Sequence, residues 1–121
     1  MSSEYEKFTR ECKEEVTAQG NDENFLSLTK AWYTSASLAK YSYHFEWLGR
    51  PVIQYPQDLI ALQEIIWRVK PDLIIETGIA HGGSLIFYAS MLGFLDWCSA
   101  AQSGKNSEQG ESSRLVLGID I

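Results

Sequence analysis

The sequence predicts an α/β fold, more narrowly a Rossmann-like unit with two strands preceded by N-terminal helices. The apolar run Leu73–Ile75 ends in the acid Glu76, which is typical of a parallel strand buried on both faces. A loop with three glycines, residues 78–83, follows it and leads into an apolar helix over residues 84–92. A second apolar strand, residues 114–120, also ends in an acid. The order strand, glycine loop, helix, strand and acid is half of a Rossmann-like cofactor-binding unit.

The elements ahead of the first strand are expected to be mostly helical. Helical spacing of apolar residues predicts three helices, and Gly49 and Pro51 predict an extended loop before the last of them. The three helices and the loop cover residues 3–18, 25–43, 57–69 and 45–55. We therefore expect an N-terminal helical extension, residues 1–46, and a partial Rossmann-like cofactor-binding domain, residues 47–121.

Composition limits the class of protein. A chain of 121 residues, 45% of them hydrophobic, can bury one modest core, so we expect one domain or part of one. The net charge of −6 argues against nucleic acid as the partner. No apolar stretch is expected to reach the length of a membrane span, and the N-terminus is too polar for a secretory signal, which favours a cytoplasmic location. Cys12 and Cys98 lack the spacing of a zinc site or disulfide framework.

Three cofactor sites compete for the glycine loop. A nucleoside triphosphate P-loop is the weakest, because Ser84-Leu85 stands where that motif needs Lys followed by Ser or Thr. A dinucleotide site fits better, because Gly78, Ala80 and Gly83 follow the pattern G-x-A-x-x-G. The gap from Gly83 to Asp120 is longer than the ~20 residues that usually separate the glycine motif from the ribose-binding acid. The dinucleotide motif fits only if the polar segment over residues 99–113, the polar excursion, is an insertion that lengthens this gap. The third site is one for S-adenosylmethionine.

The run E-T-G-I-A-H-G-G-S, residues 76–84, resembles the first motif of class I methyltransferases, in which an acid stands two positions before the first glycine. Three further segments make the resemblance more specific: W-L-G-R-P at 47–51, Q-Y-P-Q-D at 54–58 and G-I-D-I at 118–121. With them, the segment from Trp47 to Ile121 resembles the cephalosporin hydroxylase and rhamnosyl O-methyltransferase family.

This resemblance implies an S-adenosylmethionine-dependent O-methyltransferase with a Rossmann-like sheet. Its acceptor would be a hydroxyl of a sugar, glycolipid or other small molecule, in lipid or polysaccharide biosynthesis, commonly with a divalent metal such as magnesium. By motif position, Asp120 would hold the ribose. The other cofactor-binding residues, at the methionine end, would be Glu76, Gly78, Ala80, Gly82, Gly83 and Ser84. The metal ligands of the family would lie in later strands, beyond Ile121, so none is assigned here.

Two further candidates have simpler explanations. His81, in the glycine loop, is within reach of an acceptor as a catalytic base, but a loop-shaping role is favoured because no partner acid can be assigned to it. Residues 55–58 would border the acceptor site, but a helix start explains Pro56 and Asp58 more simply.

Because two parallel strands make an incomplete sheet, we expect this chain to be the N-terminal part of an enzyme and inactive alone. The alternatives are a dinucleotide-binding Rossmann domain, and a non-catalytic fragment or interaction module that binds another chain through Trp32 and Tyr33. A homo-oligomer is left open.

Overall fold

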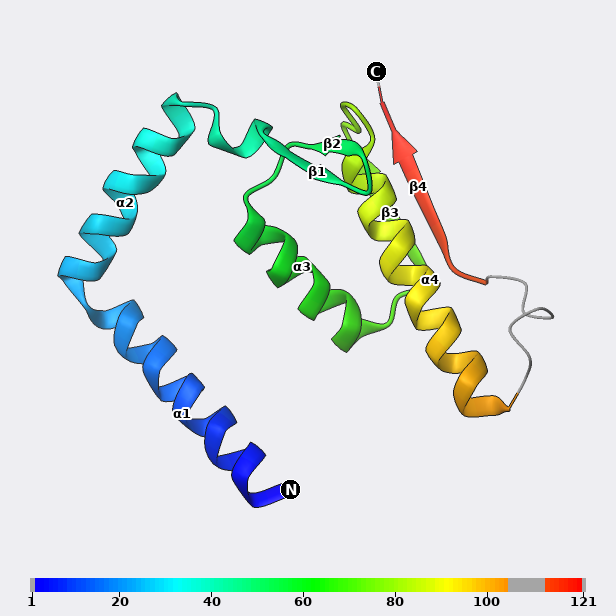
Figure 1. The fold of residues 1–121 in the computed structure, drawn as a ribbon, viewed down its shortest axis with the longest axis horizontal. Helices are drawn as coiled ribbons and strands as arrows, with labels where there is room; N and C mark the ends of the chain where they lie inside the picture. Colours follow the sequence, from blue (N-terminus) through cyan, green and yellow to red (C-terminus); the bar gives the residue numbers. More distant parts are fainter. Residues whose placement is uncertain (1, 105–112, 121) are drawn as a thin grey trace. The chain divides into compact units, whose positions relative to one another are not determined.

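The structure is a computed structural model that describes residues 2–104 and 113–120 (Figure 1). The chain divides into two compact units, Met1–Ala39 and Lys40–Ile121. The first unit contains helix α1, Ser2–Asn21, and helix α2, Glu23–Leu38. Asp22 separates the two helices and caps α2, because its carboxylate accepts hydrogen bonds from the amides of Asn24 and Phe25 at 2.9 and 3.0 Å. Among the described residues of this unit only Ala36 is buried.

The predicted helix over 25–43 is shorter in the structure. It ends at Leu38, and Lys40 takes a left-handed conformation with φ +53° before a short 3₁₀ helix, η1, Tyr41–Tyr43. The rest of the second unit follows η1 in this order: β1 Phe45–Trp47, β2 Arg50–Val52, α3 Pro56–Val69, β3 Leu73–Thr77, α4 Gly83–Ser103 and β4 Leu115–Ile119.

The extended loop predicted over 45–55 is wrong in part, since it contains a β-hairpin. Strands β1 and β2 pair antiparallel, with Phe45 opposite Val52 and Trp47 opposite Arg50. Leu48 and Gly49 join them, and both have positive φ, +48° and +79°. Two such residues form the tight turn that suits the twist of a hairpin, so Gly49 connects two strands rather than breaking them.

Strands β3 and β4 form a parallel pair, with Leu73 opposite Leu115 and Thr77 opposite Ile119. The core of the unit lies on one face of this pair, where Ile74 and Val116 pack against residues of α3 and α4. The buried members of that core are Ile66, Phe87, Leu92 and Leu95. An ion pair between Arg114 and Asp96 also ties the start of β4 to α4.

The opposite face of the pair is open in the described structure. The expectation that both faces of the first strand are buried is therefore wrong for these residues. The side chains that alternate with the core positions remain 45–59% exposed; they are Leu73, Ile75, Leu115, Leu117 and Ile119. The physical reason is that α3 and α4 both pack on the face that carries Ile74 and Val116.

Helix α4 is much longer than the predicted 84–92. It continues to Ser103 and ends at Gly104, which has φ +67°. The polar excursion predicted over residues 99–113 is wrong for residues 99–103, which form the end of α4, and residues 105–112 lie outside the described residues. At 21 residues, α4 is also long and apolar enough to cross a membrane, which corrects the expectation that no such stretch exists. Length and composition alone support this, and α4 supplies Phe87, Leu92 and Leu95 to the core.

The hairpin holds the beginning of α4. A Cβ atom added to Gly83 would lie 2.1 Å from the carbonyl oxygen of Pro51, so backbone meets backbone there. Further along the helix, the indole of Trp47 donates a hydrogen bond of 3.0 Å to the hydroxyl of Ser90. The ring of Trp47 also lies edge-on to Phe87, with centroids 4.9 Å apart. These contacts place the glycine loop between the hairpin and the strand pair.

Candidate functional site

The carboxyl ends of β3 and β4 bring the two parts of the predicted site to one edge. Glu76 lies opposite Gly118 in the parallel register, and the amide of Gly78 donates a 2.8 Å hydrogen bond to the carbonyl of Ile119. The pairing thus extends to the first glycine of the loop. Asp120 follows β4 directly and is exposed, so this acid and the loop begin at the same edge.

The glycine loop has the backbone that its sequence suggests. Gly78, Ala80 and Gly82 all have positive φ, +77°, +43° and +80°, a region that residues with a side chain rarely adopt. The amide of Gly82 closes a turn with the carbonyl of Ile79 at 2.7 Å. A Cβ atom at Gly78 or Gly82 would meet nothing within 4 Å. These two glycines therefore serve the turn, and the space beside them is open.

Helix α4 begins at the end of this loop. Its cap residue is Gly82, which has no side chain to bond to the first amides of the helix. Backbone N–H groups of a first helical turn have no partner within the helix, and the helix dipole is positive there. Gly83 and Ser84 begin the helix, so the loop offers donors to an anionic or carboxylate group.

The side chain of Glu76 points to the covered face of the strand pair, where it is partly buried. Its Oε2 atom is buried and has no hydrogen-bond partner among the described residues. A buried carboxylate oxygen without a partner is costly, and such an atom needs an explanation. A strand-end acid that only caps the loop would be satisfied by it, so this oxygen fits better as an acceptor for a bound group.

Tyr88, on α4, shares the environment of Glu76. Burial raises the pKa of Tyr88, and the negative charge of Glu76 raises it further. The phenol therefore remains protonated and able to donate a hydrogen bond. Tyr88 was missed from the sequence, because only the packing of α4 over β3 brings it near Glu76.

Gly118 was missed too. A Cβ atom there would lie 2.7 Å from Cγ2 of Ile79 and 2.9 Å from Cδ1 of Leu85, so its lack of a side chain lets residues of the loop and helix pack over β4. The glycine in G-I-D-I was a visible signal, but its partners depend on the strand register.

His81 lies in the turn of the loop and is exposed. Within residues 2–104 and 113–120, no acid forms an ion pair with it. The loop-shaping role therefore remains the simpler explanation of His81.

The residues predicted to border an acceptor do start a helix. Tyr55 is buried and precedes α3, Pro56 is in the first turn, and the amide of Asp58 bonds to the carbonyl of Tyr55 at 3.0 Å. Asp58 also lines a groove with Gln54, so the helix start does not account for every feature of this segment.

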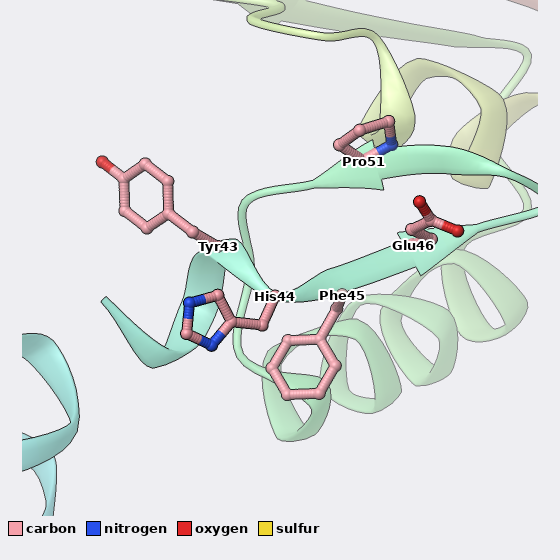
Figure 2. A pocket seen from close by; sticks show the side chains of 5 residues that line it. All are labelled: Tyr43, His44, Phe45, Glu46 and Pro51. Atoms are coloured by element: carbon pink, nitrogen blue, oxygen red, sulfur yellow. The ribbon is translucent and has the colours of Figure 1, made fainter. Parts of the chain in front are cut away.

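A metal centre has less support. In the described parts of the chain, no group of three or more His, Cys, Asp or Glu side chains could hold a metal ion. Magnesium prefers several oxygen ligands, and these residues do not supply them. Another hollow, of about 500 Å³, lies over the hairpin and is lined by Tyr43, His44, Phe45, Glu46 and Pro51. Figure 2 shows that these side chains point in different directions and do not converge on one centre.

The comparison with protein families decides the identity of the second unit. Residues 39–121 match the family described as Rhamnosyl O-methyltransferase/CmcI. The chain belongs to this family. The resemblance predicted from Trp47 to Ile121 is confirmed, and the match to the rhamnosyl O-methyltransferase family begins at residue 39, beside the boundary between the two units. Neither a curated protein nor a solved structure gave a match.

Membership identifies a methyltransferase family. The mixed helices and short sheets are compatible with part of an α/β fold. The predicted cofactor-binding residues all lie within the matched residues; they are Glu76, Gly78, Ala80, Gly82, Gly83, Ser84 and Asp120. Their individual roles are not assigned by the family match.

Proposed function

We propose that this protein is an S-adenosylmethionine-dependent O-methyltransferase whose second unit is the cofactor-binding part of a Rossmann-like fold. The observation that carries the proposal is the buried, unpartnered Oε2 of Glu76, at the strand edge where the glycine loop also begins. In a member of a methyltransferase family, a carboxylate in this position suits a bound group that carries hydrogen-bond donors.

The chemistry of the site fits S-adenosylmethionine. When bound, this cofactor supplies an electrophilic methyl group on a sulfonium. Glu76 would accept hydrogen bonds from the methionine end, and the amides at Gly83 and Ser84 would donate to its carboxylate. Asp120 would accept hydrogen bonds from the ribose hydroxyls. Gly78, Ala80 and Gly82 give the loop its backbone conformation and leave open space beside it.

The acceptor we propose is a hydroxyl of a sugar, such as a rhamnosyl group, on a glycolipid, polysaccharide or small molecule. The name of the matched family supports a rhamnosyl acceptor. His81 is a candidate base for the hydroxyl proton because it lies in the loop and is exposed. No step is assigned to magnesium, because the described residues do not form a site for it. The cytoplasmic location remains a prediction.

A dinucleotide-binding domain is the second candidate, because Gly78, Ala80 and Gly83 also fit that motif. Calorimetry on the 121-residue chain with S-adenosylmethionine and with NAD separates the two. We expect measurable affinity for S-adenosylmethionine and none, or much less, for NAD. Stronger binding of NAD would remove the methyltransferase assignment. Absence of binding by either would favour a non-catalytic interaction module.

Replacing Gly82 with valine tests the loop in the same experiment. The positive φ of Gly82 is strained for a β-branched residue, so the loop should rearrange and binding of S-adenosylmethionine should be lost. Gly20, in α1 of the other unit, has open space around it, and Gly20→Ala is the control that should leave affinity unchanged. Equal affinity of the Gly82→Val variant would show that the cofactor does not contact this loop.

A further inference from the structure

A second hollow lies on the unit that carries the glycine loop, close to Glu76 but separate from the loop. It is a groove of about 380 Å³. Residues from the segment before α3, from α3 itself and from α4 line it: Gln54, Asp58, Ala61, Leu62, Ile65 and Tyr88. Tyr88 lies beside Glu76 of the candidate cofactor site, and the other five residues are not among the predicted cofactor-binding residues.

Two kinds of side chain line this groove. Gln54, Asp58 and Tyr88 offer a neutral amide, a carboxylate and a phenol, whereas Ala61, Leu62 and Ile65 form an apolar wall along α3. A sugar ring has the same two sides, hydroxyls at its edge and C–H groups on its face. The groove is also within the size range of small-molecule sites, and a monosaccharide is smaller than its volume.

Tyr88 connects this groove to the candidate cofactor site. It lines the groove, and it is close enough to Glu76 for the negative charge of that residue to act on the phenol. A ligand beside Tyr88 would therefore lie near the methionine end of a cofactor bound at Glu76. That is the end from which a methyl group would be transferred.

We propose that this groove binds the sugar acceptor, with Asp58 and Gln54 hydrogen-bonded to its hydroxyls and Tyr88 at the end nearest the cofactor. This inference rests on the proposed function and names the acceptor-binding residues for it. Asp58 accepts hydrogen bonds from hydroxyl groups, Gln54 both donates and accepts, and the protonated phenol of Tyr88 donates. The apolar wall of α3 contacts the ring face.

The test is binding of methyl rhamnoside to the 121-residue chain, followed by ligand-observed saturation-transfer NMR and titrated to saturation. Asp58→Asn replaces one acceptor oxygen of the carboxylate with an amide donor and removes the charge, and Tyr88→Phe removes the phenolic hydroxyl; both substitutions preserve the shape of the side chain. We expect each to weaken sugar binding about tenfold, as for the loss of one good hydrogen bond. Glu64→Gln, on an exposed position of α3 that does not line the groove, should leave sugar affinity unchanged. Circular dichroism checks that all three variants fold as the parent chain does.

Affinity for S-adenosylmethionine, measured on the same variants, separates this inference from the proposed function. If Asp58→Asn loses affinity for the sugar and keeps its affinity for S-adenosylmethionine, the assignment of the groove as the acceptor site is supported. A chain that binds S-adenosylmethionine but not the sugar, or that binds the sugar equally well after both substitutions, overturns the groove assignment. If the chain binds the sugar through Asp58 but has no affinity for S-adenosylmethionine, the groove assignment stands and the cofactor assignment is overturned.

Discussion

Gly82 and Gly83 are neighbours in the loop, yet each must be glycine for a different reason. At Gly82 the reason is the backbone, because φ is +80° and a Cβ atom would meet nothing within 4 Å. At Gly83 the reason is space, because a Cβ atom would lie 2.1 Å from the carbonyl oxygen of Pro51 and 2.8 Å from Cα of Val52. Backbone atoms of a paired strand cannot move aside as the end of a flexible side chain can.

These two reasons predict different costs. Gly82→Ala should lower the free energy of unfolding by about 1 kcal/mol, the cost of left-handed backbone in a residue with a Cβ atom. Gly83→Ala should lower it by about 3 kcal/mol, because the hairpin or the helix must shift. Urea unfolding of both variants measures the difference. Equal losses would mean that the hairpin does not pack on Gly83 as closely as described.

Tyr88 and Glu76 should also be visible in a pH titration. Burial is the larger cause of the raised pKa of Tyr88, and the charge of Glu76 adds to it. A raised pKa means that the stabilising contribution of the neutral phenol is present below the ordinary value of 10.0. It is lost as the pH rises through that value and then through the higher pKa of the folded chain.

Glu76→Gln should therefore lower the pKa of Tyr88 part of the way back to its ordinary value, because burial remains. The difference in tyrosinate absorbance between chains with and without Tyr88→Phe isolates this one phenol from the other tyrosines. Asp72→Asn, which replaces an exposed acid before β3, is the control that should leave the titration unchanged. A Tyr88 pKa that is the same in the Glu76→Gln variant as in the parent chain would contradict the proximity of the two side chains.

At the scale of elements, one chain of hydrogen bonds contributes to the contact between the hairpin and α4. The indole of Trp47 donates to Ser90, and the hydroxyl of Ser90 donates to the carbonyl of Phe87 at 2.7 Å. Ser99 makes a similar bond to its own helix, to the carbonyl of Leu95 at 2.9 Å. Both hydroxyls donate to a carbonyl of their own helix, but Ser90 also accepts a hydrogen bond from the hairpin. Ser99 is therefore a matched control for Ser90.

Ser90→Ala should lower the free energy of unfolding by about 1–2 kcal/mol, because it leaves the partly buried indole N–H without its acceptor. Ser99→Ala should lower the free energy of unfolding by less than half as much as Ser90→Ala does, since alanine is a better helix former than serine. Thermal unfolding of the two variants, followed by tryptophan fluorescence, checks this order. The opposite order would show that the hairpin does not hold α4 through Trp47.

The elements that were predicted well from the sequence are those whose signal is local. The helix expected over 57–69 is α3, Pro56–Val69, because Pro56 and a regular apolar face define it. The two strands expected over 73–76 and 114–120 are β3 and β4, since short β-branched and leucine runs bounded by glycine or acid residues carry that signal.

The elements that were missed depend on contacts between distant residues. The hairpin at 45–52 has strands of only three residues, too short for an alternating pattern, and Trp47 gains its partner Ser90 only from the fold. The end of α4 was placed too early because small and polar residues after Leu92 weaken its apolar pattern. For the candidate site, the glycine loop and its two acids could be predicted, but Tyr88 and the groove beside α3 could not. Their proximity comes from the packing of α3 and α4 on the same face.

At the scale of the whole molecule, the two units differ in how much they bury. The N-terminal unit buries one described residue, Ala36, whereas the second unit has a core made by α3, α4, β3 and β4. Most of the stability of helices in proteins comes from tertiary packing of an apolar face, and helices α1 and α2 have little of it among the described residues. The family match begins at residue 39, so the boundary in sequence and the boundary in structure nearly coincide.

A chain that begins at Lys40 should therefore retain the properties of the site. Glu76, the glycine loop and Asp120 all belong to the second unit, and so does the core that positions them. We expect the 40–121 fragment to keep its affinity for S-adenosylmethionine within about threefold, which corresponds to less than about 1 kcal/mol. Its thermal unfolding midpoint should change by only a few degrees.

Calorimetry and thermal unfolding of this fragment beside the full chain measure both quantities. Helical content by circular dichroism should fall on removal of α1 and α2, which confirms that a helical unit was removed and not an already unfolded one. If affinity were lost while the fragment still unfolded cooperatively, residues of the first unit would have to contact the cofactor. The site would then be shared between the two units, and the assignment of every cofactor contact to residues after Lys40 would be wrong.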